Sequence, residues 1–376
     1  MSQSLSDPVA LAKALIACPS VTPVDAGAQD LLAEWLAALG FEVRRQTFGD
    51  VPNLYAWRGE GAKRLCFAGH TDVVPPGQED AWTTPPFEPS EDDGMLRGRG
   101  ASDMKGAVAA FIAAIAARPD AKTPLALLIT GDEEGPGIDG TKRMLSWLAE
   151  EGLEFSHCVV GEPTSRDRLG DMVKVGRRGS MNAVVTVTGQ QGHVAYPHQA
   201  DNPLPAASRI AAALAGLVLD EGYTSFQPSN LEITGWGSAA TAENVIPADA
   251  WLRFNVRFNP NWTGESLCQH LEEVIAGEAQ GADWSWKPRV SGEAFLNEDP
   301  GLTGLVSRAI TDVTGLEPEL STSGGTSDAR FIAKVCPSIE FGLSGATMHQ
   351  VDERVPINDI EKLCEIYQLV IERFIE

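Results

Sequence analysis

An imidazole and a carboxylate follow the first short apolar run of this sequence. The run covers residues 64–69, and His70 and Asp72 come directly after it. Because the two residues are two positions apart, their side chains point to the same side of an extended backbone. A carboxylate placed in this way can accept the N–H of one imidazole nitrogen and leave the other nitrogen for a metal ion. A histidine that merely caps a loop is the alternative interpretation.

Three consecutive acids, Asp132 to Glu134, follow a second apolar run at residues 124–130. Carboxylates next to a buried strand are costly unless they are solvated, paired or bound to a metal ion. Adjacent glutamates allow a division of labour, because one can bind a metal ion while the other takes a proton from water. A solvated turn is the alternative for this run.

Three further residues complete a candidate ligand set. Asp103 precedes an alanine-rich stretch, Glu162 follows an apolar run at 158–161, and His349 lies near the C-terminal end. Taken singly, Asp103 is equally well explained as a helix cap. Two imidazoles and three carboxylates suit Zn²⁺, and they also suit Mn²⁺ or Co²⁺. The predicted ligands are His70, Asp103, Glu134, Glu162 and His349, and Glu133 is left free.

The elements that position these residues can be read from the apolar patterns. The three runs are short and bounded by turn residues, which is typical of buried strands. Helical patterns near 103–117 and 138–151 lie between them. This alternation predicts an α/β fold with a mostly parallel central sheet flanked by helices. The candidate ligands then lie at the carboxyl ends of strands, where open α/β sheets place their sites.

The pattern changes in the middle of the chain. Residues 181–187 and 252–258 alternate between apolar and more polar side chains, which favours antiparallel strands with one buried face. Helical stretches accompany them at 203–219 and 264–279. We therefore expect a catalytic domain of residues 1–178 and 292–376, interrupted by an inserted α+β domain of residues 179–291.

Composition limits the classes of partner. The chain has 376 residues and a net charge of 29 − 52 = −23, which argues against binding nucleic acid or anionic lipid. Its longest uncharged apolar run, 106–117, is shorter than the about 20 residues that cross a bilayer. No signal-peptide pattern is seen at the N-terminus, and the six cysteines have no short pairing spacing. We expect a cytoplasmic protein with no membrane partner.

Four segments together resemble the dinuclear zinc aminoacylase/carboxypeptidase family of metallopeptidases. They are His-Thr-Asp at 70–72, Gly-Ala-Ser-Asp-Met-Lys-Gly at 100–106, Asp-Glu-Glu-Gly at 132–135 and Gly-Glu-Pro at 161–163. The resemblance implies two Zn²⁺ ions per subunit, with Co²⁺ or Mn²⁺ as possible substitutes. It also implies that the inserted domain is a lid that makes a homodimer.

The resemblance assigns a role to each candidate. Asp103 would bridge the two metal ions, and the peptide bond after it would be cis. One ion would be held by His70 and Glu162, and the other by Glu134 and His349. In catalysis, Glu133 would act as general base and then general acid, with Asp72 as the partner of His70. His193 would reach the site of the partner subunit and stabilise the oxyanion.

Further stretches resemble members that act on small anionic amides. They lie at 176–180, 191–198, 244–247, 323–328 and 345–349, and they imply hydrolysis of the succinyl amide of N-succinyl-LL-2,6-diaminopimelate. Acetylornithine deacetylase or dipeptidase activity is the alternative within the family, and a non-catalytic dimeric binding protein is the alternative outside it. We leave Glu243 out of the contacts, because a carboxylate would repel an anionic substrate. The implied substrate-binding residues are Arg177, Tyr196, Asn244, Arg257 and Thr326.

Overall fold

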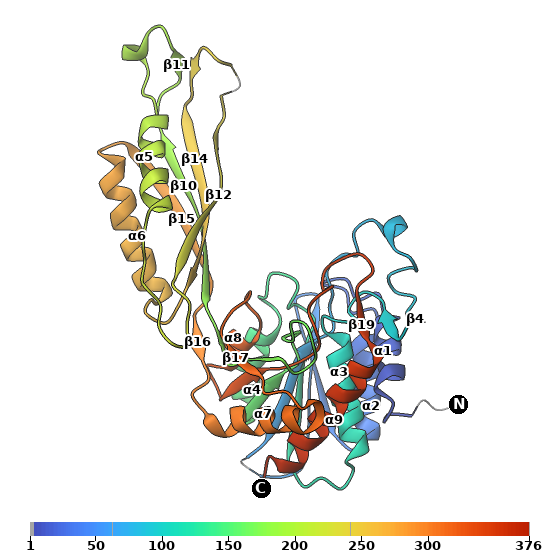
Figure 1. The fold of residues 1–376 in the computed structure, drawn as a ribbon. Coiled ribbons are helices and arrows are strands. Elements are labelled where there is room, and N and C mark those ends of the chain that lie inside the picture. Colours follow the sequence, from blue (N-terminus) through green and yellow to red (C-terminus); the bar gives the residue numbers. More distant parts are fainter. Residues whose placement is uncertain (1–3, 62, 241, 376) are drawn as a thin grey trace. The chain divides into compact units, whose positions relative to one another are not determined.

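The chain folds into two compact units. The structure is a computed structural model that describes residues 4–61, 63–240 and 242–375. Unit 1 comprises residues 1–175, 297–321 and 327–376, and unit 2 comprises 176–296 and 322–326. The sequence patterns placed the two domain boundaries at 178/179 and 291/292, whereas the units divide at 175/176 and 296/297. Figure 1 labels the elements of both units.

Unit 1 is built on an eight-stranded sheet with the order β1-β2-β6-β3-β7-β18-β8-β17. Its strands β3, β6, β7 and β18 run parallel, and β8 and β17 form a further parallel pair. The predicted mostly parallel α/β sheet is therefore confirmed. The bounds are β1 Glu42–Phe48, β2 Val51–Arg58, β3 Leu65–His70, β6 Leu125–Thr130, β7 His157–Val160, β8 Met172–Lys174, β17 Glu319–Ser321 and β18 Ser338–Glu340.

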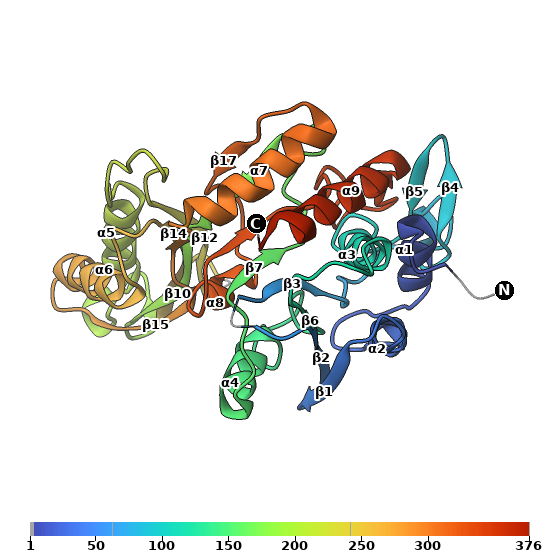
Figure 2. The same ribbon diagram turned by 90° about the horizontal axis from the view of Figure 1, so that it is seen from below.

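Helices cover both faces of this sheet. The long helices α3, α7 and α9 lie on one face and α4 lies on the other (Figure 2). Helix α3 is buried along nearly its whole length, which explains why its sequence is almost entirely apolar. The helices of unit 1 are α1 Pro8–Ile16, α2 Ala28–Ala38, α3 Lys105–Ala117, α4 Thr141–Glu151, α7 Pro300–Thr314, α8 Ala329–Ile332 and α9 Ile357–Arg373, with the 3₁₀ turn η1 Glu79–Ala81.

An antiparallel hairpin at the sheet edge was not expected from the sequence. Strands β1 and β2 pair along their whole length, from Glu42 opposite Trp57 to Phe48 opposite Val51. Strand β1 is largely exposed and polar, so it lacks the apolar run that marks the inner strands. A small three-stranded sheet also forms in unit 1, from β4 Ser90–Asp92, β5 Met95–Arg97 and β19 Arg354–Pro356.

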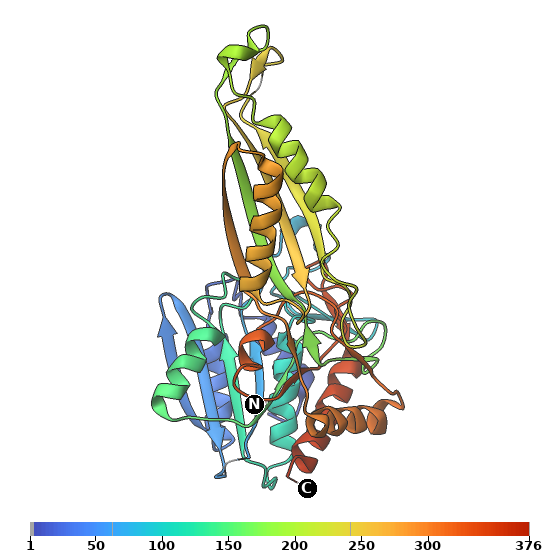
Figure 3. The ribbon, with the colours of Figure 1, turned by 90° about the vertical axis from the view of Figure 1, so that its left-hand side faces the viewer.

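Unit 2 is an antiparallel sheet with two helices on one face. The strand order is β12-β14-β10-β15, and α5 and α6 cover the side seen in Figure 3. Alternate residues of β10 and β14, such as Val185 and its partner Leu252, are buried in the core under the helices. The alternation predicted this arrangement correctly. The bounds are β10 Gly179–Thr188, α5 Leu204–Ala215, β12 Asn230–Ser238, β14 Asp249–Phe258, α6 Gly264–Ala279 and β15 Asp283–Gly292.

Short elements extend both ends of this unit. Strands β11 (Gly192–His193) and β13 (Val245–Ile246) pair beyond one end of the sheet, next to the 3₁₀ turn η2 (Pro197–Gln199). Strands β9 (Gly176–Arg177) and β16 (Phe295–Leu296) pair at the other end. Among the described residues, no helix combines the length and the apolar character needed to span a membrane.

Three aromatic rings in mutual contact form the centre of the unit 1 core. The ring of Phe111 on α3 lies 4.4 Å from that of Phe67 on β3 and 4.4 Å from that of Tyr367 on α9. All three residues are fully buried. This cluster joins the sheet to the two helices that pack above it.

We expect Phe111→Ala to lower the free energy of unfolding by about 3–5 kcal/mol, because it removes a ring from a core that cannot fully close around the cavity. Urea denaturation followed by circular dichroism measures the change. Val218→Ala, at a position that is 72% exposed, is the control and should shift the value by less than about 0.5 kcal/mol. A loss below about 1 kcal/mol for Phe111→Ala would show that this cluster does not hold the core together.

Candidate metal centre

The sequence-predicted ligands meet at one edge of the unit 1 sheet. His70 ends β3, Glu134 lies in the loop after β6, and Glu162 lies just after β7. These three strands are parallel neighbours, so the residues that follow them lie side by side. Asp103 precedes α3 and His349 lies in the loop before β19, and both reach the same edge.

Asp103 lies between two imidazoles. Its Oδ1 is 3.2 Å from Nε2 of His70, and its Oδ2 is 3.3 Å from Nε2 of His349. The Nε2 of His70 is also 3.9 Å from a carboxylate oxygen of Glu162, and the Nε2 of His349 is 2.9 Å from one of Glu134. Among the described residues, three groups of possible ligand atoms lie within 4.8 Å of one another. Two of these groups share the Asp103 carboxylate, and the third combines His70 with Glu133 and Glu134.

The carboxylates of this cluster raise the pKa values of the two imidazoles and so favour their protonated form. Burial alone would lower the pKa of His70, but the hydrogen bond and charge of Asp103 outweigh it and raise that pKa well above its usual value. Hydrogen bonds to Asp103 and Glu134 raise the pKa of His349 to about 10. Burial opposes ionisation of Asp103, yet its bonds to the two imidazoles hold its pKa below the usual range. A field that attracts protons in this way also favours divalent cations, which replace those protons on binding.

Glu133 lies beside the cluster, and the pKa of its carboxyl group is raised. Burial and then the charge of Glu162 raise its pKa well above that of a free glutamate. Its side chain is only partly buried. A basic carboxylate beside a group of metal-ligand atoms has the properties required of a general base.

Asp72 does not hold His70 in the way that the sequence suggested. The Nδ1 of His70 is 2.8 Å from the main-chain oxygen of Asp72, whereas it is 3.7 Å from the carboxylate. The carboxylate instead accepts the backbone N–H groups of Glu133, at 3.3 Å, and Glu134, at 3.0 Å. Burial raises the pKa of Asp72 to about 6. Asp72 thus fixes the imidazole through its backbone and the acidic loop through its side chain.

Two glycines let the start of α3 approach the sheet. A Cβ at Gly69 would lie 2.4 Å from the side chain of Met104, and one at Gly161 would lie 2.7 Å from it. Met104 follows Asp103 directly, and the peptide bond between them is cis, as the resemblance implied. Without a side chain at either glycine, the segment that carries Asp103 can lie directly on the ends of β3 and β7.

Three of the unit 2 candidates gather beyond one end of its sheet. His193 is paired with Val245 in the small β11–β13 ladder, and the oxygen of Asn244 accepts the N–H of Val194. The ring of Tyr196 lies 5.8 Å from that of His193. The Nδ1 of His193 accepts the N–H of Ala195 at 3.0 Å, so the neutral ring carries its proton on Nε2. That nitrogen is therefore a hydrogen-bond donor.

The other three unit 2 candidates lie at the opposite end of the sheet. Arg177 is buried and donates to the oxygen of Gly325 at 3.0 Å, next to Thr326. In the described part of the chain, the Nη1 of Arg257 is buried without a hydrogen-bond partner. Burial lowers the pKa of the adjacent Arg178, and the charge of Arg257 lowers it further. This end of unit 2 concentrates positive charge.

Strand β10 separates the two groups. It has 10 residues and runs from the arginine end, at Gly179, to the His193 end, at Thr188. A strand rises about 3.3 Å per residue, so the groups are roughly 30 Å apart. Within one copy of unit 2, a single small molecule cannot contact both.

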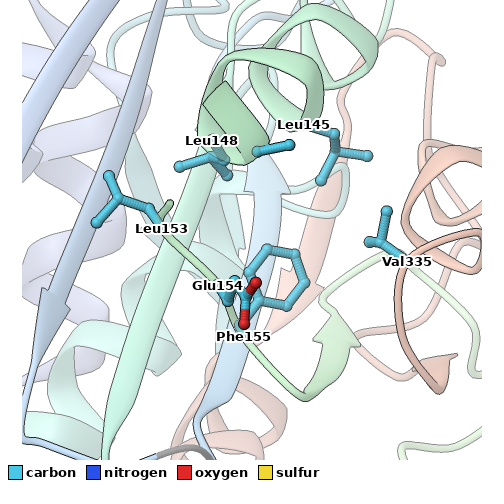
Figure 4. A pocket seen from close by; sticks show the side chains of 7 residues that line it. Leu145, Leu148, Leu153, Glu154, Phe155 and Val335 are labelled. Carbon is cyan, nitrogen blue, oxygen red and sulfur yellow. The ribbon is translucent and has the colours of Figure 1, made fainter. Parts of the chain in front are cut away.

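A hollow elsewhere in unit 1 is not part of this site. It has a volume of about 360 Å³ and is lined mainly by α4 and the loop that precedes β7 (Figure 4). Phe155, in its wall, lies at the amino end of β7, whereas the candidate ligands lie at the carboxyl ends of the strands.

A buried ion pair next to the segment that contains Asp103 could not be found from the sequence. Arg99 and Glu353 are both buried, and an oxygen of Glu353 lies 2.6 Å from Nη1 of Arg99. They are 254 residues apart in the chain and belong to no recognisable spacing. Only the fold brings them together.

Comparison with known proteins shows the family of this chain. Residues 66–373 match the model of Peptidase family M20/M25/M40, and the chain belongs to this family. It is 56% identical over 370 residues to succinyl-diaminopimelate desuccinylase of Caulobacter vibrioides (strain NA1000 / CB15N), covering 98% of this chain and 96% of that protein. It is 54% identical over 377 residues to the protein of the same name from Phenylobacterium zucineum (strain HLK1), covering 98% of each.

Solved structures with low sequence identity share the fold. Aminopeptidase PepT from Bacillus cereus superimposes with a TM-score of 0.81 at 19% identity, over 99% of both chains. The YXEP protein of Bacillus subtilis, described as a dinuclear metal binding peptidase from the M20 family, gives a TM-score of 0.74 at 17% identity, over 98% of this chain and 97% of that one.

We expect Asp72→Asn to lower kcat about 10–100-fold, the usual cost of disturbing residues that orient metal ligands. The amide would present a donor to one of the two N–H groups that the carboxylate now accepts. Steady-state kinetics and metal content measure the effect. Asp7→Asn is a matched control, because Asp7 also accepts two backbone N–H groups but at the start of α1. Equal losses in both variants would contradict a specific role for Asp72.

Proposed function

We propose that this protein is a metal-dependent hydrolase that cleaves the succinyl amide of N-succinyl-LL-2,6-diaminopimelate, releasing succinate and LL-2,6-diaminopimelate. The main support is the identity of 56% over 98% of the chain to a relative named succinyl-diaminopimelate desuccinylase. The product is a precursor of lysine and of the cell wall. The geometry at Asp103 supplies independent support for metal-dependent chemistry.

The donor set fits two divalent cations. His70, Asp103 and Glu162 would hold one ion, and Asp103, Glu134 and His349 would hold the other. Three carboxylates and two neutral imidazoles carry a formal charge of −3, which two divalent ions would more than offset. Nitrogen and carboxylate ligands suit Zn²⁺, which we propose as the ion, with Co²⁺ or Mn²⁺ as substitutes. When bound, such a pair would polarise the amide carbonyl and acidify water.

The proton transfers fall to Glu133. We assign it as the base that takes a proton from the attacking water, whose oxygen forms the new bond to the succinyl carbonyl carbon. As the C–N bond breaks, Glu133 returns that proton to the departing amine nitrogen. Its raised pKa suits both steps, because a carboxyl that is too acidic would accept the proton poorly. The Nε2–H of His193 would donate to the oxyanion.

Substrate carboxylates require local cations in a protein with a net charge of −23. Arg257 is the strongest candidate because its buried Nη1 has no partner within the described residues. Arg177 and Thr326 lie at the same end of unit 2, and Arg177 also holds the backbone at Gly325. An arginine grips a carboxylate through its planar fork. Tyr196 and Asn244 would contact the substrate alongside His193.

A homodimer would allow both groups of unit 2 candidates to contribute to substrate-binding sites. Because β10 keeps His193 roughly 30 Å from the arginine end, the two groups would serve different sites, one of them on the partner subunit. The edge strand β12 is the favoured contact, since it carries Trp236, which is 57% exposed. The opposite edge, β15, carries Lys287, Pro288 and Arg289, residues that discourage strand pairing.

We propose a cytoplasmic location. The six cysteines are free thiols in the structure. Unpaired cysteines in a chain of this size agree with a reducing compartment. The location would also suit an enzyme of amino-acid biosynthesis.

The first experiment is hydrolysis of N-succinyl-LL-2,6-diaminopimelate by the purified protein, before chelation, after it and with Zn²⁺ restored. We expect activity that is lost with the metal and returns with it, because the residues alone do not polarise the amide. Acetylornithine and dipeptides are the comparison substrates. A clear preference for either would redirect the proposal to that activity, and metal binding without turnover of any of them would leave only a binding role.

The role of His193 can be tested with hybrid dimers. Glu133→Gln should lower kcat by about 10²–10⁴-fold while metal is retained, and His193→Ala should also be nearly inactive. A mixture of equal parts should recover about a quarter of wild-type activity, because half the dimers are hybrids with one intact site of two. Each variant alone is the control. If purified hybrids, isolated through two different affinity tags, are as inactive as their parents, His193 does not act across subunits.

A further inference from the structure

A buried carboxylate outside the ligand set lies directly behind Asp103. Glu353 has no exposed surface, and it lies one residue before β19. Neither it nor its partner Arg99 belongs to the proposed proton transfers or to the metal ligands. Glu353 and Arg99 nevertheless contact the segments that contain two of the proposed ligands, Asp103 and His349.

Glu353 binds the backbone of the segment that contains Asp103. One carboxylate oxygen accepts the N–H groups of Ser102, at 2.9 Å, and Asp103, at 3.1 Å. The other accepts the N–H of Gly100 at 3.1 Å and a guanidinium hydrogen of Arg99 at 2.6 Å. Four donors thus converge on one carboxylate, and three of them fix the course of the backbone up to Asp103.

Arg99 extends these contacts to the segment that contains His349. Its Nη2 is 3.5 Å from the main-chain oxygen of His349. The guanidinium also lies over the ring of Trp82, 5.3 Å from its centre. The ladder between β5 and β19 joins the same two parts of the chain, with Arg97 opposite Arg354. The side chains of Arg99 and Glu353 therefore connect the backbones of two proposed ligands.

The ion pair of Arg99 and Glu353 has no net formal charge, so it adds no repulsion to the acidic metal centre beside it. A second unpaired carboxylate behind Asp103 would add repulsion, whereas the Arg99 guanidinium cancels the charge of Glu353 at short range. The pair can hold the backbone without changing the charge that the metal ions must balance. Buried carboxylates with charged and N–H partners are rigid, since breaking one contact leaves a buried charge unpaired.

We infer that Glu353, with Arg99, is a positioning residue of the metal centre: it sets the distance between Asp103 and His349 and so controls metal affinity. This inference rests on the proposed function, because it takes those residues as ligands. Glu353 contacts the proposed ligands only through their backbone or through Arg99. Loss of its carboxylate would therefore weaken metal binding directly, and it would affect the substrate only through the metal centre.

The test is metal binding by Glu353→Gln. The protein is stripped with a chelator and titrated with Zn²⁺ against a competing fluorescent indicator, and the visible spectrum of the Co²⁺ form reports the ligand geometry. We expect the dissociation constant for Zn²⁺ to rise about 10–100-fold and the Co²⁺ spectrum to change. Asp352→Asn is the matched control: it is the neighbouring carboxylate, but its side chain accepts from Thr83 and Arg97 instead.

The outcomes are distinct. Wild-type affinity and spectrum in a folded Glu353→Gln protein would overturn the inference, as would equal losses in Glu353→Gln and Asp352→Asn. If wild-type protein binds no metal, the proposed function fails as well. Should Glu353→Gln not fold, Arg99→Lys decides the matter. It keeps the charge opposite Glu353 but loses the nitrogen near His349, and it should weaken Zn²⁺ binding with the Co²⁺ spectrum altered, whereas unchanged binding would overturn the inference.

Discussion

The structure of unit 1 depends on placing several carboxylates at one edge of a buried sheet. Like charges at such short range repel one another strongly where water is scarce. Several of these carboxylates face donors: imidazoles face Asp103, and backbone N–H groups face Asp72. Glu353 faces both N–H groups and a guanidinium. The remaining negative charge lies among the candidate ligand atoms, where it would attract a cation.

Much of the fold could be predicted because of where its strands lie. Strands β3 and β6 are buried along their whole length, so they appear as continuous apolar runs. Strand β10 has one buried face and therefore alternates. The β1–β2 hairpin was missed because β1 is exposed and has neither pattern. The domain boundaries depend on the pairing of Gly176–Arg177 with Phe295–Leu296, which is too short to leave any periodicity.

The candidate centre was readable for a related reason. A candidate ligand at or just after the end of a buried strand, such as His70 or Glu162, has a position in space that follows from the sheet alone. Contacts that depend on tertiary packing produce no recognisable pattern in the sequence. Nothing in the sequence indicates that Glu353 lies against Asp103, or that the carboxylate of Asp72 binds the backbone of Glu133 and Glu134 instead of His70.

The length of β10 has a consequence for substitutions. In the proposed arrangement, Arg257 on β14 recognises a substrate carboxylate near one end of β10, and His193 on β11 assists bond cleavage beyond the other end. Substitutions at one end leave the packing at the other undisturbed, because distant sites contribute nearly independently. Under the proposed roles, a substitution near Arg257 would change substrate recognition while the packing around His193 stays the same.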